Sequence, residues 1–109
     1  MSNVAIALGS NLDDRLRYLK LAYAELSRVM TITGMSQVYE TEPVGGPDQG
    51  AYLNAVVTGE VSLGPREFLQ ACHDIEASLG RERVVRWGAR TIDIDLLAYD
   101  TLVTDNIPQ

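Results

Sequence analysis

The sequence predicts an α+β fold of the ferredoxin-like type, with the element order β-α-β-β-α-β, a mostly antiparallel sheet and helices packed on one face. Two observations predict it. Segments in which every second residue is apolar alternate with two segments in which apolar residues recur every three or four positions. Gly, Pro, Asn and Asp residues mark most of the boundaries between them. The chain has 109 residues, which suits a single domain over residues 1–109.

The first half of the chain reads as a strand, a helix and an extended segment. Val4–Leu8 is a short apolar run that ends in a Gly-Ser-Asn turn, as a buried strand does. Residues 31–39 are rich in β-branched side chains and are expected to be extended, with an interruption near Gly34. A helix is expected after the Gly-Ser-Asn turn. Ser10 or Asn11 could cap this helix, or the turn could bring the N-terminus of the helix up to a phosphate. The apolar stripe of that helix is Leu12, Leu16, Leu19, Tyr23, Leu26 and Met30.

The second half begins with a loop over residues 40–51, rich in Gly and Pro and long for a compact domain. Residues 52–61 alternate as a strand with one buried face. A second helix is expected to open at Pro65 and to close at Gly80. A strand follows from about residue 91, then a short apolar stretch at residues 102 and 103. The stripe of the second helix is Phe68, Cys72, Ile75 and Leu79.

Composition excludes several classes of protein. The net charge of −6 and the pI near 4.6 argue against nucleic-acid and acidic-membrane partners, which require broad basic surfaces. Cys72 is the single cysteine, so the chain has no intrachain disulfide and no cysteine-based metal motif. The N-terminus has neither a basic leader region nor an apolar run long enough to span a membrane. We expect a cytoplasmic protein that is a monomer or a weak homo-oligomer.

Residues 86–95 carry the strongest chemical signal. The alternation from residue 91 onward places Asp93 and Asp95 on one face of a strand, with Cα atoms about 6.6 Å apart. Two carboxylates at that spacing can share a hard cation such as Mg²⁺. A solvated strand face with alternating acids is the plainer alternative. Arginines favour the metal and polyphosphate interpretation, because this acidic chain concentrates them just before the strand at positions 81, 83, 86 and 90.

Other polar residues have two interpretations each. Tyr52 and Asn54 share a strand face and could stack on and hydrogen-bond to a planar heterocycle, or could simply face water. Trp87 could anchor its loop or close over a ligand. Glu76 could tether its helix, bind a ligand or be an ordinary surface charge. His73 has no evident partner, so we interpret it as a surface residue.

The motifs together resemble the 6-hydroxymethyl-7,8-dihydropterin pyrophosphokinase family of folate biosynthesis. The most specific block is residues 86–95, Arg-Trp-Gly-Ala-Arg-Thr-Ile-Asp-Ile-Asp. The blocks follow one another in the family's order and cover nearly the whole chain. The others are residues 7–12, 39–45, 52–56 and 75–81.

The resemblance implies that the substrates are ATP and 6-hydroxymethyl-7,8-dihydropterin, with AMP released, and that two Mg²⁺ ions arrive with ATP. It also implies a role for each matching residue. Asp93 and Asp95 would hold the metal, and Arg81 and Arg90 would be the catalytic cations. The pterin would be bound by Thr41, Val44, Tyr52 and Asn54. ATP would be bound by Glu76, Arg83, Trp87 and Arg90.

The sequence departs from the family in its length. Family members continue beyond position 109 with a Pro-His motif, a further arginine and a second aromatic that sandwiches the pterin. The chain is therefore expected to be short at its C-terminus relative to the family. The alternative function is a truncated, non-catalytic nucleotide- or pterin-binding module of the same fold. A small metal-binding regulatory domain is a weaker interpretation, because it leaves the arginines without a role.

Overall fold

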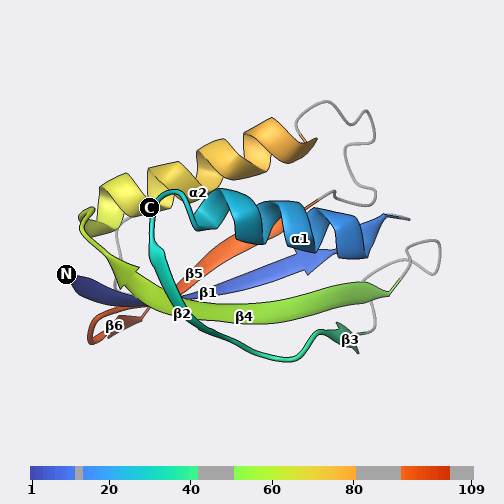
Figure 1. The fold of residues 1–109 in the computed structure, drawn as a ribbon, viewed down its shortest axis with the longest axis horizontal. Coiled ribbons are helices and arrows are strands. Elements are labelled where there is room, and N and C mark those ends of the chain that lie inside the picture. Colours follow the sequence, from blue (N-terminus) through green and yellow to red (C-terminus); the bar gives the residue numbers. More distant parts are fainter. Residues whose placement is uncertain (12–13, 42–50, 81–91, 104–109) are drawn as a thin grey trace.

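The computed structural model describes residues 1–11, 14–41, 51–80 and 92–103, and these have the predicted α+β plan (Figure 1). The second predicted strand is divided in two, and its second part, Tyr39–Thr41, extends two residues into the segment predicted as a loop. The short apolar stretch near the end forms a strand of its own. The elements are β1 (Ser2–Ser10), α1 (Arg15–Leu26), β2 (Thr31–Met35), β3 (Tyr39–Thr41), β4 (Tyr52–Val61), α2 (Pro65–Gly80), β5 (Asp93–Tyr99) and β6 (Leu102–Val103).

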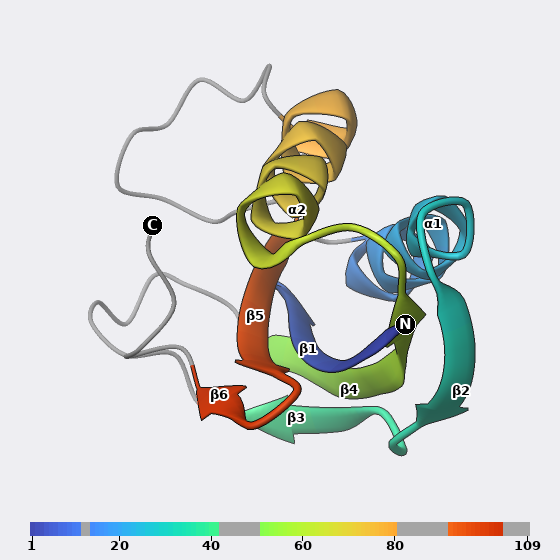
Figure 2. The ribbon, with the colours of Figure 1, turned by 90° about the vertical axis from the view of Figure 1, so that its left-hand side faces the viewer.

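The strands form one sheet in the order β2-β4-β1-β5-β6. β3 also pairs with β4, so that β2 and β3 follow each other along the same edge of β4. Every pairing among the described strands is antiparallel. Both helices lie on the same side of the sheet, so that no described helix covers its other face (Figure 2). The predicted ferredoxin-like arrangement is therefore confirmed. No helix within the described ranges is long and apolar enough to cross a membrane.

The core lies between the sheet and the two helices. In the central strand β1 the side chains of Val4, Ile6 and Leu8 are buried, at every second position. β5 contributes Ile94 and Leu96 in the same alternating way. Strand side chains point alternately to the two faces of a sheet, so the residues between these point to the uncovered face. The rest of the core consists of Leu19, Ala22, Leu26, Met30, Val57, Val61, Phe68, Cys72, Ile75, Ile92 and Tyr99.

The start of α1 differs from the prediction. The helix begins at Arg15 with Asp14 as its N-cap, and Asp14 makes no side-chain capping bond. Ser10 and Asn11 lie too far upstream to cap it, and both are buried. Ser10 and Asn11 thus belong to the packed interior, and their predicted capping role is wrong.

The buried face of α1 is also rotated from the predicted stripe. Leu19, Ala22 and Leu26 are buried, whereas Leu16 and Tyr23 are 47% and 36% exposed. Ala22 allows the helix to approach the sheet closely, and a stripe chosen by large apolar side chains overlooks such a residue. The side chains turned away from the core line an apolar hollow of about 320 Å³ beside β2, together with Leu19, Lys20, Met35 and Val38.

We expect Gly59→Ala to destabilise the fold. A Cβ at Gly59 would overlap the carbonyl oxygen of Thr31 and the Cε of Met30, where β2 pairs with β4. Overpacking of this kind costs about 1–3 kcal/mol. Gly34→Ala is the control, because its Cβ would meet only the Oγ1 of Thr58, at 2.9 Å, and that side chain can rotate. The two unfolding free energies can be compared in urea; equal losses would contradict this placement of β2.

Candidate functional site

The two acids of β5 lie on the face of the sheet opposite the helices. Ile94 and Leu96 are 2% and 1% exposed and point into the core, so that Asp93 and Asp95 point away from it. Asp95 is exposed and Asp93 is half-buried. Two residues along a strand separate their Cα atoms by about 6.6 Å. Both carboxylates therefore project from neighbouring positions on the uncovered face.

The register of the central strand places these acids opposite the predicted pterin residues. Gly9 of β1 pairs with Asp93 of β5 on one side and with Asn54 of β4 on the other. The three residues form a row across the sheet, and paired residues of neighbouring strands point to the same face. Two strand spacings separate the ends of this row by about 10 Å. Tyr52 lies two residues before Asn54 and shares its face.

Gly9 lies beneath the side chains of this row. A Cβ at Gly9 would be 3.1 Å from Asn54 Oδ1 and 3.4 Å from a ring carbon of Tyr52. Both side chains therefore lean over β1, toward the strand that carries the acids. A larger residue at position 9 would compete with them for this space.

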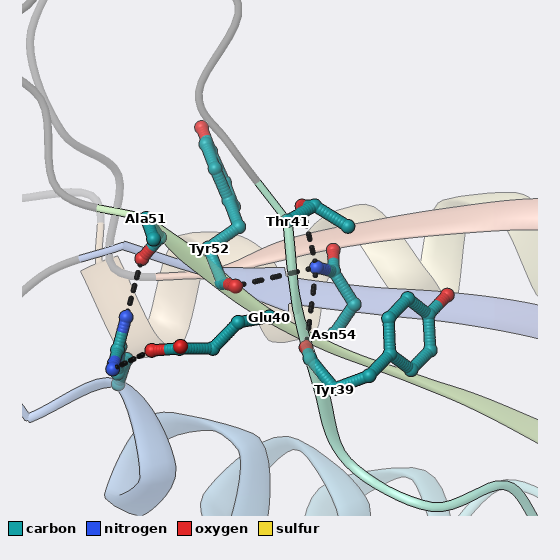
Figure 3. A network of polar contacts seen from close by, with 7 residues as sticks. Tyr39, Glu40, Thr41, Ala51, Tyr52 and Asn54 are labelled. Carbon is teal, nitrogen blue, oxygen red and sulfur yellow. Dashed lines mark hydrogen bonds and ion pairs between the residues drawn. The ribbon is translucent and has the colours of Figure 1, made fainter.

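The amide of Asn54 is held by its neighbours on β3 and β4 (Figure 3). Its Nδ2 donates to Thr41 Oγ1 at 2.8 Å and, at 3.4 Å, to the carbonyl oxygen of Tyr52. Thr41 is itself the β3 partner of Tyr52. Because the nitrogen is bonded on this side, the amide oxygen turns toward Gly9, where it can accept a hydrogen bond from a ligand. The structure thus brings together Thr41, Tyr52 and Asn54.

Several predicted site residues lie outside the described part of the chain. They are Val44, Arg81, Arg83, Trp87 and Arg90. Their roles stay predictions, as does the position of the arginines relative to Asp93 and Asp95.

Glu76 connects α2 to the edge of β5. Its carboxylate Oε2 accepts a hydrogen bond of 2.6 Å from the backbone N–H of Ile94, the residue between the two acids. Burial raises the pKa of Glu76 and the charges of Asp93 and Asp95 raise it further, although the hydrogen bond from Ile94 opposes the shift. The sequence left three roles open for Glu76: tethering its helix, binding a ligand or being a surface charge. The structure shows the first, because the carboxylate ties α2 to β5.

Cys72 and His73 of α2 do not form a nucleophile and base pair. Burial raises the pKa of Cys72 to about 12, so its thiol stays protonated and is a poor nucleophile. His73 is exposed on the surface of α2. Across the described ranges, no group of three or more His, Cys, Asp or Glu side chains could hold a metal ion. Asp93 and Asp95 would therefore need oxygen ligands from elsewhere to complete a metal site.

Sequence reasoning missed Arg15, the first residue of α1. Its Nη1 donates to the carbonyl oxygen of Ala51 at 2.6 Å, and its Nη2 forms an ion pair with Glu40 of β3. The two partners are 36 and 25 residues away in the sequence. No local pattern signals contacts at that separation; only the placement of α1 beside β3 and β4 reveals them.

We expect Glu76→Gln to change how stability depends on pH. The folded-state pKa of Glu76 is raised above its ordinary 4.5, so folding favours the protonated carboxyl. The stability that Glu76 contributes in this way is fully present below the ordinary pKa of 4.5 and is lost as the pH rises through the raised folded-state pKa. A glutamine side chain cannot ionise, and its amide oxygen can still accept from Ile94. The variant should therefore gain stability relative to wild type as the pH rises.

Urea unfolding of both proteins, without metal or nucleotide, between about pH 4 and pH 7 measures this difference. Glu76→Ala should be less stable than either, because it leaves the Ile94 N–H without its partner, at a cost of about 1–3 kcal/mol. A difference between the glutamine variant and wild type that is constant with pH, or that falls as the pH rises, would contradict the raised pKa.

Comparison with known proteins identifies the family. The chain is 48% identical over 103 residues to the 2-amino-4-hydroxy-6-hydroxymethyldihydropteridine pyrophosphokinase of Bacillus subtilis (strain 168), covering 92% of this chain and 62% of that protein. It is 39% identical over 99 residues to the Aquifex aeolicus (strain VF5) protein of the same name, covering 91% of this chain and again 62% of the relative. The bifunctional protein FolKE of Lactococcus lactis subsp. lactis (strain IL1403) is 40% identical over 104 residues, covering 94% of this chain and 30% of that protein.

The chain thus spans less than two thirds of the length of these relatives. Residues 5–109 match the family described as 7,8-dihydro-6-hydroxymethylpterin-pyrophosphokinase (HPPK). Since this match extends over nearly the whole sequence, the protein belongs to the HPPK family.

Proposed function

We propose that this protein transfers the pyrophosphoryl group of ATP to the hydroxymethyl oxygen of 6-hydroxymethyl-7,8-dihydropterin, which yields the pterin diphosphate and AMP. Membership of the HPPK family supports the reaction class. The observation that carries the proposal is the row Asp93–Gly9–Asn54 on the uncovered face of the sheet. It provides a pair of carboxylates and an aromatic-amide pair about 10 Å apart, with a glycine between them.

Asp93 and Asp95 would hold Mg²⁺ that arrives with ATP, and the donor set fits this ion. Mg²⁺ prefers oxygen ligands and is commonly bound through one or two carboxylates plus substrate phosphates. Both side chains lie on the same face, and Asp95 is exposed to solvent. When bound there, the metal would supply positive charge that stabilises the phosphates during transfer. Glu76 keeps the strand between the two acids attached to α2.

The pterin would lie over β4 and β1. Tyr52 offers an aromatic ring for stacking on the planar heterocycle. Asn54 presents its amide oxygen to the N–H groups of the ring, because Thr41 occupies its nitrogen. Val44, carried over from the family resemblance, would complete this pocket.

The transfer itself requires little covalent chemistry from the protein. The pterin hydroxyl oxygen forms a bond to the β-phosphorus of ATP, the bond from that phosphorus to the α,β-bridging oxygen breaks, AMP leaves, and the hydroxyl proton is lost. Positioning and charge stabilisation dominate such reactions. Arg81 and Arg90 would stabilise the charge on the transferring group. Arg83 and Trp87 would close over ATP, with Glu76 near the nucleotide.

Formation of AMP tests the proposal. The folded chain is incubated with ATP, Mg²⁺ and the reduced hydroxymethylpterin, and both products are measured. We expect AMP and pterin diphosphate in equal amounts, and neither when any one component is omitted. Saturable binding of both substrates by the folded chain without AMP would contradict turnover and would support a non-catalytic binding module.

We expect Asp95→Asn to reduce the rate of AMP formation by about 100-fold or more, because it removes one of the two carboxylate ligands proposed to hold Mg²⁺ beside the phosphates. Stability should stay within about 0.5 kcal/mol of wild type, since the side chain is exposed. Asp74→Asn is the matched control: Asp74 is exposed on α2 and accepts a hydrogen bond only from Gln70 among the bonds that the structure gives it. Equal rates of AMP formation for Asp95→Asn and Asp74→Asn would show that Asp95 does not take part in the reaction.

A further inference from the structure

Arg15 joins three elements at the edge of the proposed pterin site. It is the first residue of α1. Its guanidinium donates to the carbonyl oxygen of Ala51, just before β4, and pairs with the carboxylate of Glu40 in β3. Figure 3 shows Glu40 and Ala51 beside Thr41, Tyr52 and Asn54. A guanidinium suits this task because its planar fork can donate to two acceptors at once.

Both partners of Arg15 are direct chain neighbours of pterin-site residues. Glu40 precedes Thr41, and Ala51 precedes Tyr52. Thr41 and Tyr52 are themselves paired across β3 and β4. A shift of either backbone segment would therefore move a side chain that orients the pterin.

β3 needs such support because it is weakly held. It has three residues, all of them exposed, and β4 is its only partner strand in the part of the chain that the structure describes. Thr41 at its end fixes the amide of Asn54. The Arg15–Glu40 pair holds β3 from the side of α1, where no described strand pairs with it.

We propose that Arg15 is a positioning residue for the pterin site: it fixes β3 against the start of β4, so that Thr41, Tyr52 and Asn54 keep their relative positions. This inference rests on the proposed function. Exposed ion pairs contribute little to stability. Arg15 is 30% exposed and its partner Glu40 57% exposed, so the pair is expected to matter for the geometry of the site more than for folding.

The test separates pterin binding from nucleotide binding. Calorimetric titrations of 6-hydroxymethylpterin and of a non-hydrolysable Mg-ATP analogue are made with wild type, Arg15→Ala, Arg15→Lys and Glu40→Gln. Arg15→Ala should bind the pterin about tenfold more weakly, as expected if the site is correctly arranged a tenth of the time. Its affinity for the nucleotide analogue should change less than about twofold, since the acids of β5 are untouched.

The conservative variants check the mechanism. Lysine can reach Glu40 but lacks the planar fork, so Arg15→Lys should lie between alanine and wild type. Glu40→Gln keeps a hydrogen-bond acceptor without its charge and should also give an intermediate loss. Backbone amide signals of residues 39–41 and 52–54 should shift in Arg15→Ala even without ligand, while the melting temperature changes little.

Arg28→Ala is the matched control. Arg28 also lies near α1 in an exposed ion pair, at 3.7 Å from Glu25, but it follows the C-terminal end of the helix, opposite the end that carries Arg15. Its removal should leave both affinities unchanged. Equal pterin affinity of Arg15→Ala and Arg28→Ala, or an equal loss of pterin and nucleotide affinity in Arg15→Ala, would overturn the positioning role. A wild-type chain that binds no pterin would instead refute the proposed function and this inference with it.

Discussion

The antiparallel register of β1 between β4 and β5 is the constraint on which the site depends. A shift of one residue would turn every side chain of a strand to the opposite face. Ile6 and Leu8 of β1 anchor the register, because they are buried against the helices at 0% and 1% exposure. With those positions buried, Gly9 must face the uncovered side, and its partners Asp93 and Asn54 face it as well. The register that buries the apolar side chains on one face of the sheet therefore also fixes which polar side chains meet on the other face.

Electrostatics at the edge of β5 is consistent with a cationic ligand. Burial raises the pKa of Glu76, and the negative charges of Asp93 and Asp95 on the neighbouring strand raise it further. Such repulsion is relieved when a cation binds nearby. Glu76 accepts the Ile94 N–H, so its role is to hold the strand, while Asp93 and Asp95 project toward the uncovered face.

Local patterns predicted the fold well where one side of an element is buried and the other is not. The alternation in β4 and β5 and the Pro65 and Gly80 boundaries of α2 are all confirmed. The stripe predicted for α1 is confirmed at Leu19, Leu26 and Met30, which are buried. It was wrong at Leu16 and Tyr23, because the small residue Ala22 is buried in their place.

Long-range contacts limited the prediction of the site. Alternation was enough to place Asp93 and Asp95 on one face, but their distance from Asn54 depends on strand order and register. The bond from Ile94 to Glu76 and the contacts of Arg15 join residues 18 to 36 positions apart. Their chemistry is visible only once the elements have packed.

Paramagnetic relaxation with Mn²⁺-ATP in place of Mg²⁺-ATP tests the central claim most directly, because it maps the metal onto the fold. Backbone amide signals should broaden most at Asp93–Asp95 and Gly9, less at Asn54 across the sheet, and least at Tyr23 on the outer side of α1. Broadening centred on the helical face, or spread evenly over the molecule, would contradict a nucleotide site on the uncovered face of the sheet.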